Sequence, residues 1–292
     1  MKSTFSTVLI TGSSKGLGYA LVKVGLAQGY NVIACSRAPD TITIEHSNLL
    51  KLKLDVTDVK SVETAFKDAK RRFGNVDIVI NNAGYGLVGE FESYNIEEMH
   101  RQMNVNFWGV AYITKEALNL MRESGKGGRI LQISSVAGYY PSPCLSMYNA
   151  SKFAVEGLSQ TIMRELDPNW NIAITIVQPG GMQTEWASSN MQWAKPHPAY
   201  ENDRSWRPFW ENYHGCEETD PNKAAELLYS IAKLDRPPQK LVLGHDSLEL
   251  IRKQHQEIGE ELESNVALST SVAKDDFDPA SVETLRQNLQ SM

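Results

Sequence analysis

The stretch "TVLITGSSKGLG", residues 7–18, decides the fold of this chain of 292 residues. Its first part, "TVLIT", is a β-branched and aliphatic run without alternation, which is typical of a strand covered on both faces. The turn "TGSSKGLG", Thr11–Gly18, then leads directly into a helix-length stretch at 16–28. Strand, glycine turn and helix in this order predict the first unit of a parallel α/β sheet.

The same rhythm continues along the chain. Further strand-like runs lie at 31–35, 49–56, 77–82, 129–135, 172–177 and 240–244, and further helix-length stretches at 59–73, 96–122 and 147–167. Because strand and helix alternate, we expect an α/β fold, namely a Rossmann-type doubly wound parallel sheet of about seven strands with right-handed crossovers.

Two regions interrupt this rhythm. Residues 183–220 contain no clear strand but four tryptophans, and so long an irregular connection usually covers a functional site. Residues 246–265 predict one polar helix, and residues 268–292 have the composition of a disordered polar tail. We therefore expect a single domain over 1–267, with 183–220 inserted as a lid before the last helix and strand.

The composition narrows the classes of function. The 29 Lys and Arg against 35 Asp and Glu give a net charge of -6, which opposes binding to nucleic acid. Cys35, Cys144 and Cys216 lack the spacing of a disulfide framework or a zinc site, and His197 and His214 show no metal-ligand spacing. No signal peptide and no apolar run long enough to span a membrane is recognisable, so we expect a cytoplasmic protein without a metal.

The turn after the first strand can hold a pyrophosphate group. Gly12, Gly16 and Gly18 would let phosphate oxygens approach free N–H groups at the positive end of a helix dipole. Glycines in an ordinary turn are the alternative interpretation. The strand before the turn and the amphipathic helix after it favour phosphate binding.

The end of the second strand bears on the choice of nucleotide. The position where an acidic side chain would hold a ribose 2′-hydroxyl carries Ser36, followed by Arg37. Arg37 can pair with a 2′-phosphate, and Lys15 in the glycine turn adds a second cation. We therefore expect NADP(H) rather than NAD(H). A solvated surface arginine is the alternative, but it does not explain the missing acid.

Seven motifs occur in a characteristic order. They are "TGSSKGLG" (11–18), "LDV" (54–56), "NNAG" (81–84), "NVN" (104–106), "ISSVAG" (133–138), "YNASK" (148–152) and "PGGMQT" (179–184). In this order the chain resembles the short-chain dehydrogenase/reductase family, in its branch of roughly 250 residues. A weaker similarity points to the hydroxysteroid- and retinol-dehydrogenase members of that family.

The resemblance implies where a dinucleotide would bind. Asp55 and Val56 would contact the adenine, the loop Asn82–Gly84 would line the ribose, and Thr184 would bind the nicotinamide carboxamide. The small residues of "PGG" let the backbone approach the nicotinamide. The predicted cofactor-binding residues are Gly12, Ser14, Lys15, Gly16, Leu17, Gly18, Ser36, Arg37, Asp55, Val56, Asn82, Ala83, Gly84, Tyr148, Lys152, Pro179, Gly180 and Thr184.

Tyr148 and Lys152 of "YNASK" lie one helical turn apart, and two further pairs, beginning at Tyr19 and Tyr229, have the same spacing. The spacing alone therefore decides nothing. Tyr148 is the tyrosine that also has a serine, Ser135, at the end of the preceding strand. We interpret Tyr19 and Tyr229 as packing residues whose lysines reach to solvent.

Asn106, Ser135, Tyr148 and Lys152 resemble the catalytic Asn-Ser-Tyr-Lys set of the family. Carbonyl reduction needs an acid near the oxygen that gains charge, and a tyrosine stabilised by a neighbouring ammonium can supply the proton. Ser135 would hydrogen-bond the substrate oxygen. Lys152 would also hold the nicotinamide ribose, and Asn106 would anchor a water that relays protons.

The lid and the loop after Ser135 predict an apolar, aromatic substrate pocket. The alternative is that the rings pack the lid onto its own domain or onto another subunit. The predicted substrate contacts are Ser135, Tyr139, Tyr140, Cys144, Trp186 and Trp193.

These observations favour an NADPH-dependent carbonyl reductase, or alcohol dehydrogenase in reverse, acting on a medium-sized apolar ketone or aldehyde. A non-catalytic NADPH-binding regulator and a redox-neutral cyclase on the same fold are the alternatives. The resemblance also implies a homodimer or homotetramer.

Overall fold

The computed structural model describes residues 6–278 and 280–290. Contacts between residues divide the chain into two units, Met1–Leu248 and Glu249–Met292. Within the described residues, no helix combines the length and the apolar character that crossing a membrane requires.

The division between the units falls inside helix α8 (His245–Ser264), before the boundary that we expected after residue 267. The second unit contains two further helices, α9 (Val266–Thr270) and α10 (Ser281–Gln290). These two helices occupy the stretch for which we expected a disordered tail.

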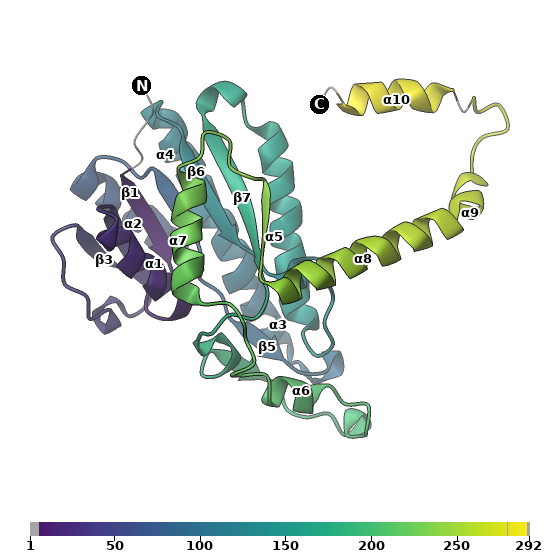
Figure 1. Cartoon of the computed structure of the whole chain (residues 1–292), viewed down its shortest axis with the longest axis horizontal. Helices are drawn as coiled ribbons and strands as arrows, with labels where there is room; N and C mark the ends of the chain where they lie inside the picture. The colour runs from purple at the N-terminus through teal and green to yellow at the C-terminus, as the bar shows by residue number, and fades with distance from the viewer. Residues whose placement is uncertain (1–5, 279, 291–292) are drawn as a thin grey trace. The chain divides into compact units, whose positions relative to one another are not determined.

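A sheet of seven parallel strands forms the centre of the first unit (Figure 1). In spatial order the strands are β3 (Leu49–Lys53), β2 (Asn31–Ser36), β1 (Thr7–Thr11), β4 (Ile78–Asn81), β6 (Gly128–Ile133), β7 (Ile172–Pro179) and β9 (Lys240–Leu243). The predicted doubly wound parallel sheet is confirmed. The strand order reverses between β1 and β4, which is where such sheets form a crevice for a ligand.

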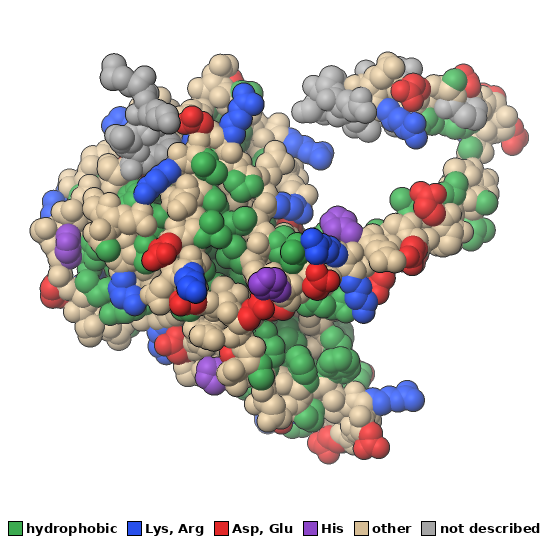
Figure 2. All heavy atoms as spheres, viewed as in Figure 1, with side chains coloured by type: hydrophobic (Ala, Val, Ile, Leu, Met, Phe, Trp, Pro, Cys, Tyr) green, Lys and Arg blue, Asp and Glu red, His purple; other side chains and the backbone are tan. Residues whose placement is uncertain are grey.

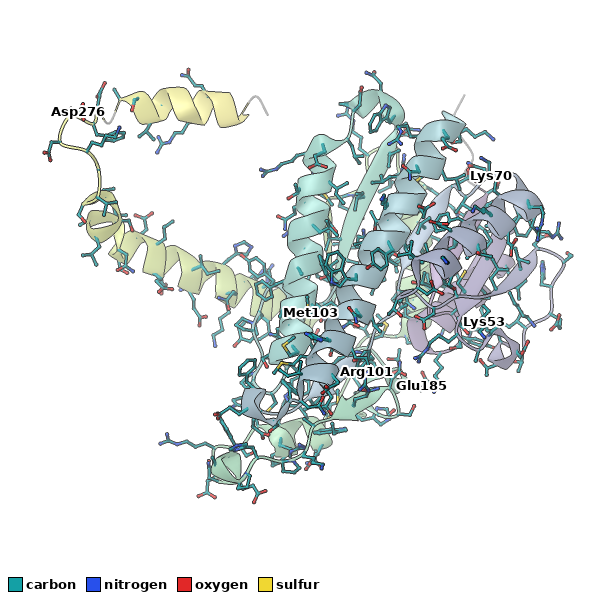
Figure 3. The ribbon with its side chains drawn as sticks, turned by 180° about the vertical axis from the view of Figure 1, so that it is seen from behind. Lys53, Lys70, Arg101, Met103, Glu185 and Asp276 are labelled. Atoms are coloured by element: carbon teal, nitrogen blue, oxygen red, sulfur yellow. The ribbon has the colours of Figure 1, made fainter. Side chains whose placement is uncertain are left out.

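Both faces of the sheet are covered, as the unalternating strands require. In β1, Val8 and Ile10 enter one hydrophobic core and Leu9 enters the other. The first core lies under helices α1 (Gly16–Ala27) and α7 (Pro221–Ala232). The second lies under α2 (Val59–Phe73), α4 (Gly109–Ser124) and α5 (Ser146–Glu165), of which α4 and α5 are in front when the molecule is seen from behind (Figure 3).

The stretch 96–122 forms two helices rather than one. Helix α3 (Ile96–Met103) is followed by a π-helical turn, η3 (Asn104–Trp108), and then by α4. A π turn inserts an extra residue into a helix and often marks a functional position. Short 3₁₀ turns complete this part of the chain and its neighbours: η1 (Pro39–Thr41), η2 (Phe91–Ser93), η4 (Val136–Gly138) and η5 (Pro168–Trp170).

The lid contains a strand, so our expectation of none in 183–220 was wrong. Strand β8 (Met191–Trp193) pairs in parallel with β5 (Gly86–Val88), a short strand that follows β4. The pattern was missed because three residues are too few to show a periodicity. The rest of the lid consists of η6 (Glu185–Ala187), η7 (Pro198–Tyr200) and α6 (Arg207–Glu211). Figure 2 shows hydrophobic side chains gathered around α6. The exposed large hydrophobic side chains of the lid include Trp193, Tyr200, Trp206 and Phe209.

Tyr229 is a core residue, as predicted. Its side chain is fully buried, and its hydroxyl donates a hydrogen bond to the carbonyl oxygen of Leu21 in α1 over 2.9 Å. Replacing Tyr229 by Phe removes this buried hydrogen bond to the helix, so we expect the free energy of unfolding to fall by about 1 kcal/mol. Urea denaturation measures this loss. Tyr19→Phe, at a half-buried phenol on the same helix as Leu21, is the matched control and should change stability by less than about 0.5 kcal/mol.

Candidate active site

The crevice between β1 and β4 is held together by one threonine. The Thr11 hydroxyl oxygen accepts hydrogen bonds from the backbone N–H groups of Asn82 and Ala83, both over 3.0 Å. The Asn82 amide in turn donates to the carbonyl oxygens of Thr11 and Gly12 over 2.9 and 3.2 Å. The predicted pyrophosphate loop and the predicted ribose loop are therefore fixed to each other.

The glycines of the first turn make room for the protein's own backbone. Gly12 has a φ of +67°, and a Cβ there would lie 2.9 Å from the Cα of Ala83. A Cβ on Gly18 would lie 2.2 Å from the carbonyl oxygen of Gly12. The third glycine, Gly16, has a φ of +51° and faces the Thr184 side chain.

Helix α1 begins with free N–H groups. Its N-cap residue, Lys15, has an extended backbone. Among the described residues, no side chain makes a capping hydrogen bond at this end of the helix. Lys15 is exposed. An uncapped helix start next to a cation suits an anionic group such as a phosphate.

The end of β2 lies beside this turn, because Thr11 of β1 is in register with Cys35. Ser36 is buried and its hydroxyl oxygen accepts a hydrogen bond from the N–H of Ala38 over 3.0 Å. Arg37 is exposed and acts on the Asp55 carboxyl. Partial burial raises the pKa of Asp55, but hydrogen bonds from Thr57 and the charge of Arg37 outweigh it and lower the pKa overall.

The Ser135 side chain lies close enough to the Tyr148 phenol to lower its pKa. Ser135 caps the turn η4 at the end of β6, where its hydroxyl oxygen also accepts from the N–H of Ala137 over 3.1 Å. Tyr148 lies in the first turn of α5 and is buried. Burial raises the pKa of Tyr148 to about 12. The Ser135 side chain has a smaller effect on this pKa and lowers it.

Lys152 is buried one turn further along α5. Its ammonium donates to the carbonyl oxygen of Ile133 over 2.7 Å and lies 5.7 Å from the centre of the Tyr148 ring. A Cβ on Gly84 would lie 3.8 Å from the same nitrogen. Burial lowers the pKa of Lys152 to about 8, and the nearby Glu156 carboxylate opposes this effect.

Glu156 was not among the predicted site residues. It lies a further turn along α5, and its carboxylate accepts from the Gln178 amide over 3.0 Å and pairs with Lys240 over 3.1 Å. Its side chain is buried. A spacing of four residues after Lys152 on one helix face is the signal that could have identified it.

Asn106 lies in the π turn η3 and is fully buried. Its amide donates to the Tyr85 carbonyl oxygen and the Ser151 hydroxyl, and its side-chain oxygen accepts from the Tyr85 N–H over 3.1 Å. That oxygen lies 3.3 Å from the Cβ position of Gly84. Asn106 therefore joins the loop after β4 to helix α5, close to Lys152.

An apolar cluster surrounds the Tyr148 ring. The ring centre of Trp186 lies 5.2 Å from that of Tyr148, at 53° between the planes. Cys144 packs against the same cluster and has a φ of +62°, which is strained for a residue with a side chain. The other members are Val88, Ala137, Leu145, Ala187, Met191, Trp210 and Tyr213.

Three predicted substrate residues have other contacts. Tyr139 presents its ring to the Lys240 ammonium over 5.7 Å, beside Glu156. Trp193 stacks with the Arg207 guanidinium over 5.2 Å and is partly exposed. The backbone carbonyl oxygen of Tyr140 lies near the side-chain amide of Asn149. The structure brings the ring of Trp186, another predicted substrate contact, to Tyr148.

The loop after β7 is packed by residues that the sequence did not single out. A Cβ on Gly180 would lie 2.1 Å from the Asp246 carboxylate, which accepts from the N–H of Gly181 over 2.7 Å. A Cβ on Gly181 would lie 2.4 Å from the Tyr213 hydroxyl. Thr184 caps η6, where its hydroxyl oxygen accepts from the N–H of Trp186.

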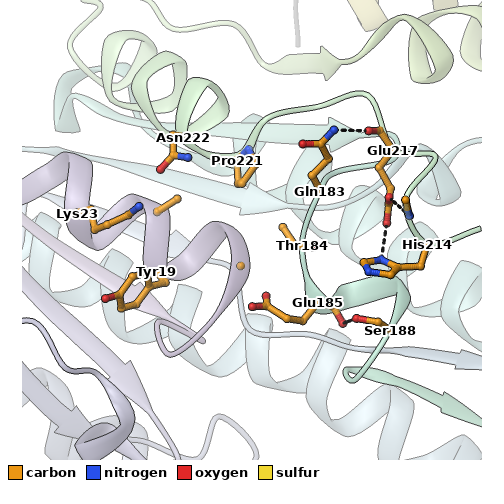
Figure 4. A pocket seen from close by; sticks show the side chains of 13 residues that line it. Tyr19, Lys23, Gln183, Thr184, Glu185, Ser188, His214, Glu217, Pro221 and Asn222 are labelled. Carbon is orange, nitrogen blue, oxygen red and sulfur yellow. Dashed lines mark hydrogen bonds and ion pairs between the residues drawn. The ribbon is translucent and has the colours of Figure 1, made fainter.

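A pocket of about 480 Å³ lies beside the glycine turn (Figure 4). Tyr19 and Lys23 of α1 line one side of it, and Gln183 and Glu185 of the lid line the other. Gly16 and Thr184 also belong to its wall, whereas Ser135 and Tyr148 do not. The pocket therefore flanks the predicted dinucleotide crevice rather than the Tyr148 hydroxyl.

Comparisons with known proteins show the family of this chain. The family model described as short chain dehydrogenase matches residues 6–195. An uncharacterized oxidoreductase of Schizosaccharomyces pombe is 99% identical over 292 residues, with 100% of both chains covered. A short-chain dehydrogenase from Streptomyces avermitilis is similar in structure, with a TM-score of 0.85, 28% identity, and 93% of this chain and 100% of that chain covered. An alcohol dehydrogenase from Thermococcus sibiricus complexed with 5-hydroxy-NADP has a TM-score of 0.67 and 27% identity, over 82% of this chain and 95% of that chain.

The buried ammonium of Lys152 makes stability depend on pH. Its pKa is about 8 in the folded protein against 10.5 in the unfolded chain, so the unfolded chain binds more protons between these values. The cost of burying the charge is on the order of a few kcal/mol below pH 8 and falls as the pH rises. We expect the free energy of unfolding of the wild type to rise between pH 8 and 10 relative to Lys152→Met.

Denaturant unfolding at several pH values tests this expectation. Lys233→Met, at an exposed lysine, is the control for loss of a positive charge and should run parallel to the wild type. Parallel curves for the wild type and Lys152→Met would contradict the assignment of a lowered pKa to Lys152.

Proposed function

Because this chain belongs to the short-chain dehydrogenase/reductase family and is an oxidoreductase of that kind, we propose that it is an NADPH-dependent carbonyl reductase. Its substrate is a medium-sized apolar ketone or aldehyde, which it reduces reversibly to an alcohol. The single observation that carries the proposal is that the Ser135 side chain and the buried Lys152 ammonium both lie beside the Tyr148 phenol.

These three side chains act on the carbonyl oxygen. Ser135 orients the oxygen and stabilises the charge that develops on it. Tyr148 donates the proton, and its raised pKa keeps it protonated at neutral pH. Lys152 lies one turn away and stabilises the phenolate that remains. Asn106 fixes the loop after β4 next to Lys152, which positions the ammonium.

The residues at the crevice fit a dinucleotide. Reduced nicotinamide supplies a hydride when bound. The uncapped start of α1 would hold the pyrophosphate, and Thr184 and Lys152 would hold the nicotinamide end. Arg37 and Lys15 are exposed cations beside the crevice, with Ser36 at the end of β2, so they would accept a 2′-phosphate.

The intact set of Asn106, Ser135, Tyr148 and Lys152 argues against a non-catalytic regulator or a redox-neutral cyclase, neither of which needs all four. The proposal also includes a homodimer or homotetramer in the cytoplasm. Trp108 of η3 and Phe153 of α5 are large hydrophobic side chains that are 46% and 45% exposed, and they support such an association.

Replacement of Tyr148 by Phe removes the proton donor and keeps the ring. We expect kcat/KM for reduction of apolar ketones and aldehydes by NADPH to fall on the order of 100-fold or more. The loss of NADPH absorbance measures this rate. Tyr229→Phe removes a phenol of the core, from the same Tyr and Lys spacing, and should keep wild-type activity. Unchanged turnover in Tyr148→Phe would remove Tyr148 from this role.

Substitution of Arg37 by Asp places an acid where a 2′-phosphate is proposed to bind. We expect the ratio of kcat/KM with NADPH to that with NADH to fall at least about 10-fold, because the cation is lost and a like charge is added. The matched control is Arg71→Asp, at an exposed arginine of α2. An unchanged ratio in Arg37→Asp would refute the assignment of the phosphate to Arg37.

A further inference from the structure

The lid brings a second phenol to the active site. Tyr213 follows α6, and its ring packs against Trp210 with the ring centres 5.3 Å apart. Its hydroxyl lies 2.4 Å from the position that a Cβ on Gly181 would occupy. Gly181 belongs to the loop after β7 that is proposed to meet the nicotinamide. A glycine at this position therefore leaves the room into which the Tyr213 hydroxyl projects.

The Tyr213 hydroxyl has no hydrogen-bond partner among residues 6–278 and 280–290. Two other aromatic side chains of this region do have partners: the indole N–H of Trp210 donates to the Pro143 carbonyl oxygen, and the Tyr94 hydroxyl donates to the Cys144 carbonyl oxygen. Tyrosine hydroxyls that are removed from water usually find a partner. Tyr213 is half-buried, so a hydroxyl without a protein partner there is available to a ligand.

Tyr213 also lies close to the proposed proton donor. It packs against the apolar cluster that contains Tyr148, Met191 and Trp186. Its phenol acts electrostatically on Tyr148 and raises the pKa of that residue. Burial, followed by the charges of Asp246 and Glu217, raises the pKa of Tyr213 itself to about 12. Tyr213 is therefore a hydrogen-bond donor at any working pH.

The charges behind Tyr213 select against anions. Asp246, Glu217 and Glu218 all act on its phenol, and the Cα of Glu217 lies 3.3 Å from the same Cβ position on Gly181. The other side chains that pack with Tyr213 beside Tyr148 are apolar. A neutral oxygen can accept the Tyr213 proton there, whereas a carboxylate would meet three like charges.

We propose that the Tyr213 hydroxyl is a specificity-determining donor, which selects neutral apolar ketones that carry a second oxygen acceptor, such as keto esters. This inference rests on the proposed function, since it assigns the far end of the substrate whose carbonyl meets Ser135 and Tyr148. It also assigns a polar role to a lid whose other ring near Tyr148, Trp186, offers an apolar face.

Four probes of similar size separate the two ends of the substrate. Butyl phenyl ketone has no second oxygen, ethyl benzoylacetate and methyl benzoylpropionate have a neutral one at two spacings, and benzoylpropionate has a charged one. In the wild type we expect kcat/KM to be higher for at least one ester than for the ketone, and lowest for the carboxylate. In Tyr213→Phe the ratio of that ester to the ketone should fall on the order of 10-fold, with the ketone itself nearly unchanged.

Tyr200→Phe is the matched control, since it removes an exposed lid phenol that bonds Glu92, and it should keep the wild-type ratio. Equal loss for all probes in Tyr213→Phe, or a higher KM for NADPH alone, would overturn the proposal. So would an unchanged ratio.

Binding separates this inference from the proposed function. Dissociation constants of the same probes for the protein with NADP+ can be measured by tryptophan fluorescence. If no probe is reduced but the ester still binds more tightly than the ketone and loses this advantage in Tyr213→Phe, the inference stands and the reductase activity fails. If the probes are reduced and Tyr213→Phe leaves the binding ratio unchanged, the inference fails and the reductase stands.

Discussion

The hydroxyl of Thr11 is the point on which the site depends. By accepting from the N–H groups of Asn82 and Ala83, it fixes the loop after β4 to the loop after β1. The loop after β4 continues to Gly84, which lies against Asn106 and Lys152. The crevice of a doubly wound sheet opens where the strands diverge, so a bond across this gap sets its width. The proposed nucleotide loops and the proposed proton donor thus share one frame.

The buried Lys152 ammonium, which the proposed reaction needs, lowers the stability of the folded protein. Burial disfavours the charged form of Lys152, yet the proposed phenolate needs an ammonium beside it. The Glu156 carboxylate, on the next turn of α5, favours the charged form of Lys152 and so raises its pKa. Lys240 of β9 and Gln178 of β7 hold Glu156 in place. The charges therefore reach from the active-site helix to the last strand of the sheet. A change at that strand acts on Lys152 through Glu156.

The sequence predicted the features that are set by local spacing. The seven strands, and the meeting of Ser135, Tyr148 and Lys152, follow from strand ends and helical turns that a short window reveals. Tyr213 and the strand β8 were missed because tertiary contacts decide their positions: β8 has three residues and pairs with a strand about a hundred residues earlier, as the register of Met191 with Gly86 shows. The contact of Tyr139 with Lys240 was missed for the same reason, since Lys240 lies on a strand about a hundred residues later.

The pairing of β8 with β5 has a mechanical consequence. The ladder fastens the lid at Met191–Trp193, after the segment that carries Trp186 and before the segment that carries Trp210 and Tyr213, and both segments reach the cluster around Tyr148. In the proposed complex the substrate therefore meets two lid segments that are tethered at one point between them, one beside the Tyr148 ring and the other beside Gly181.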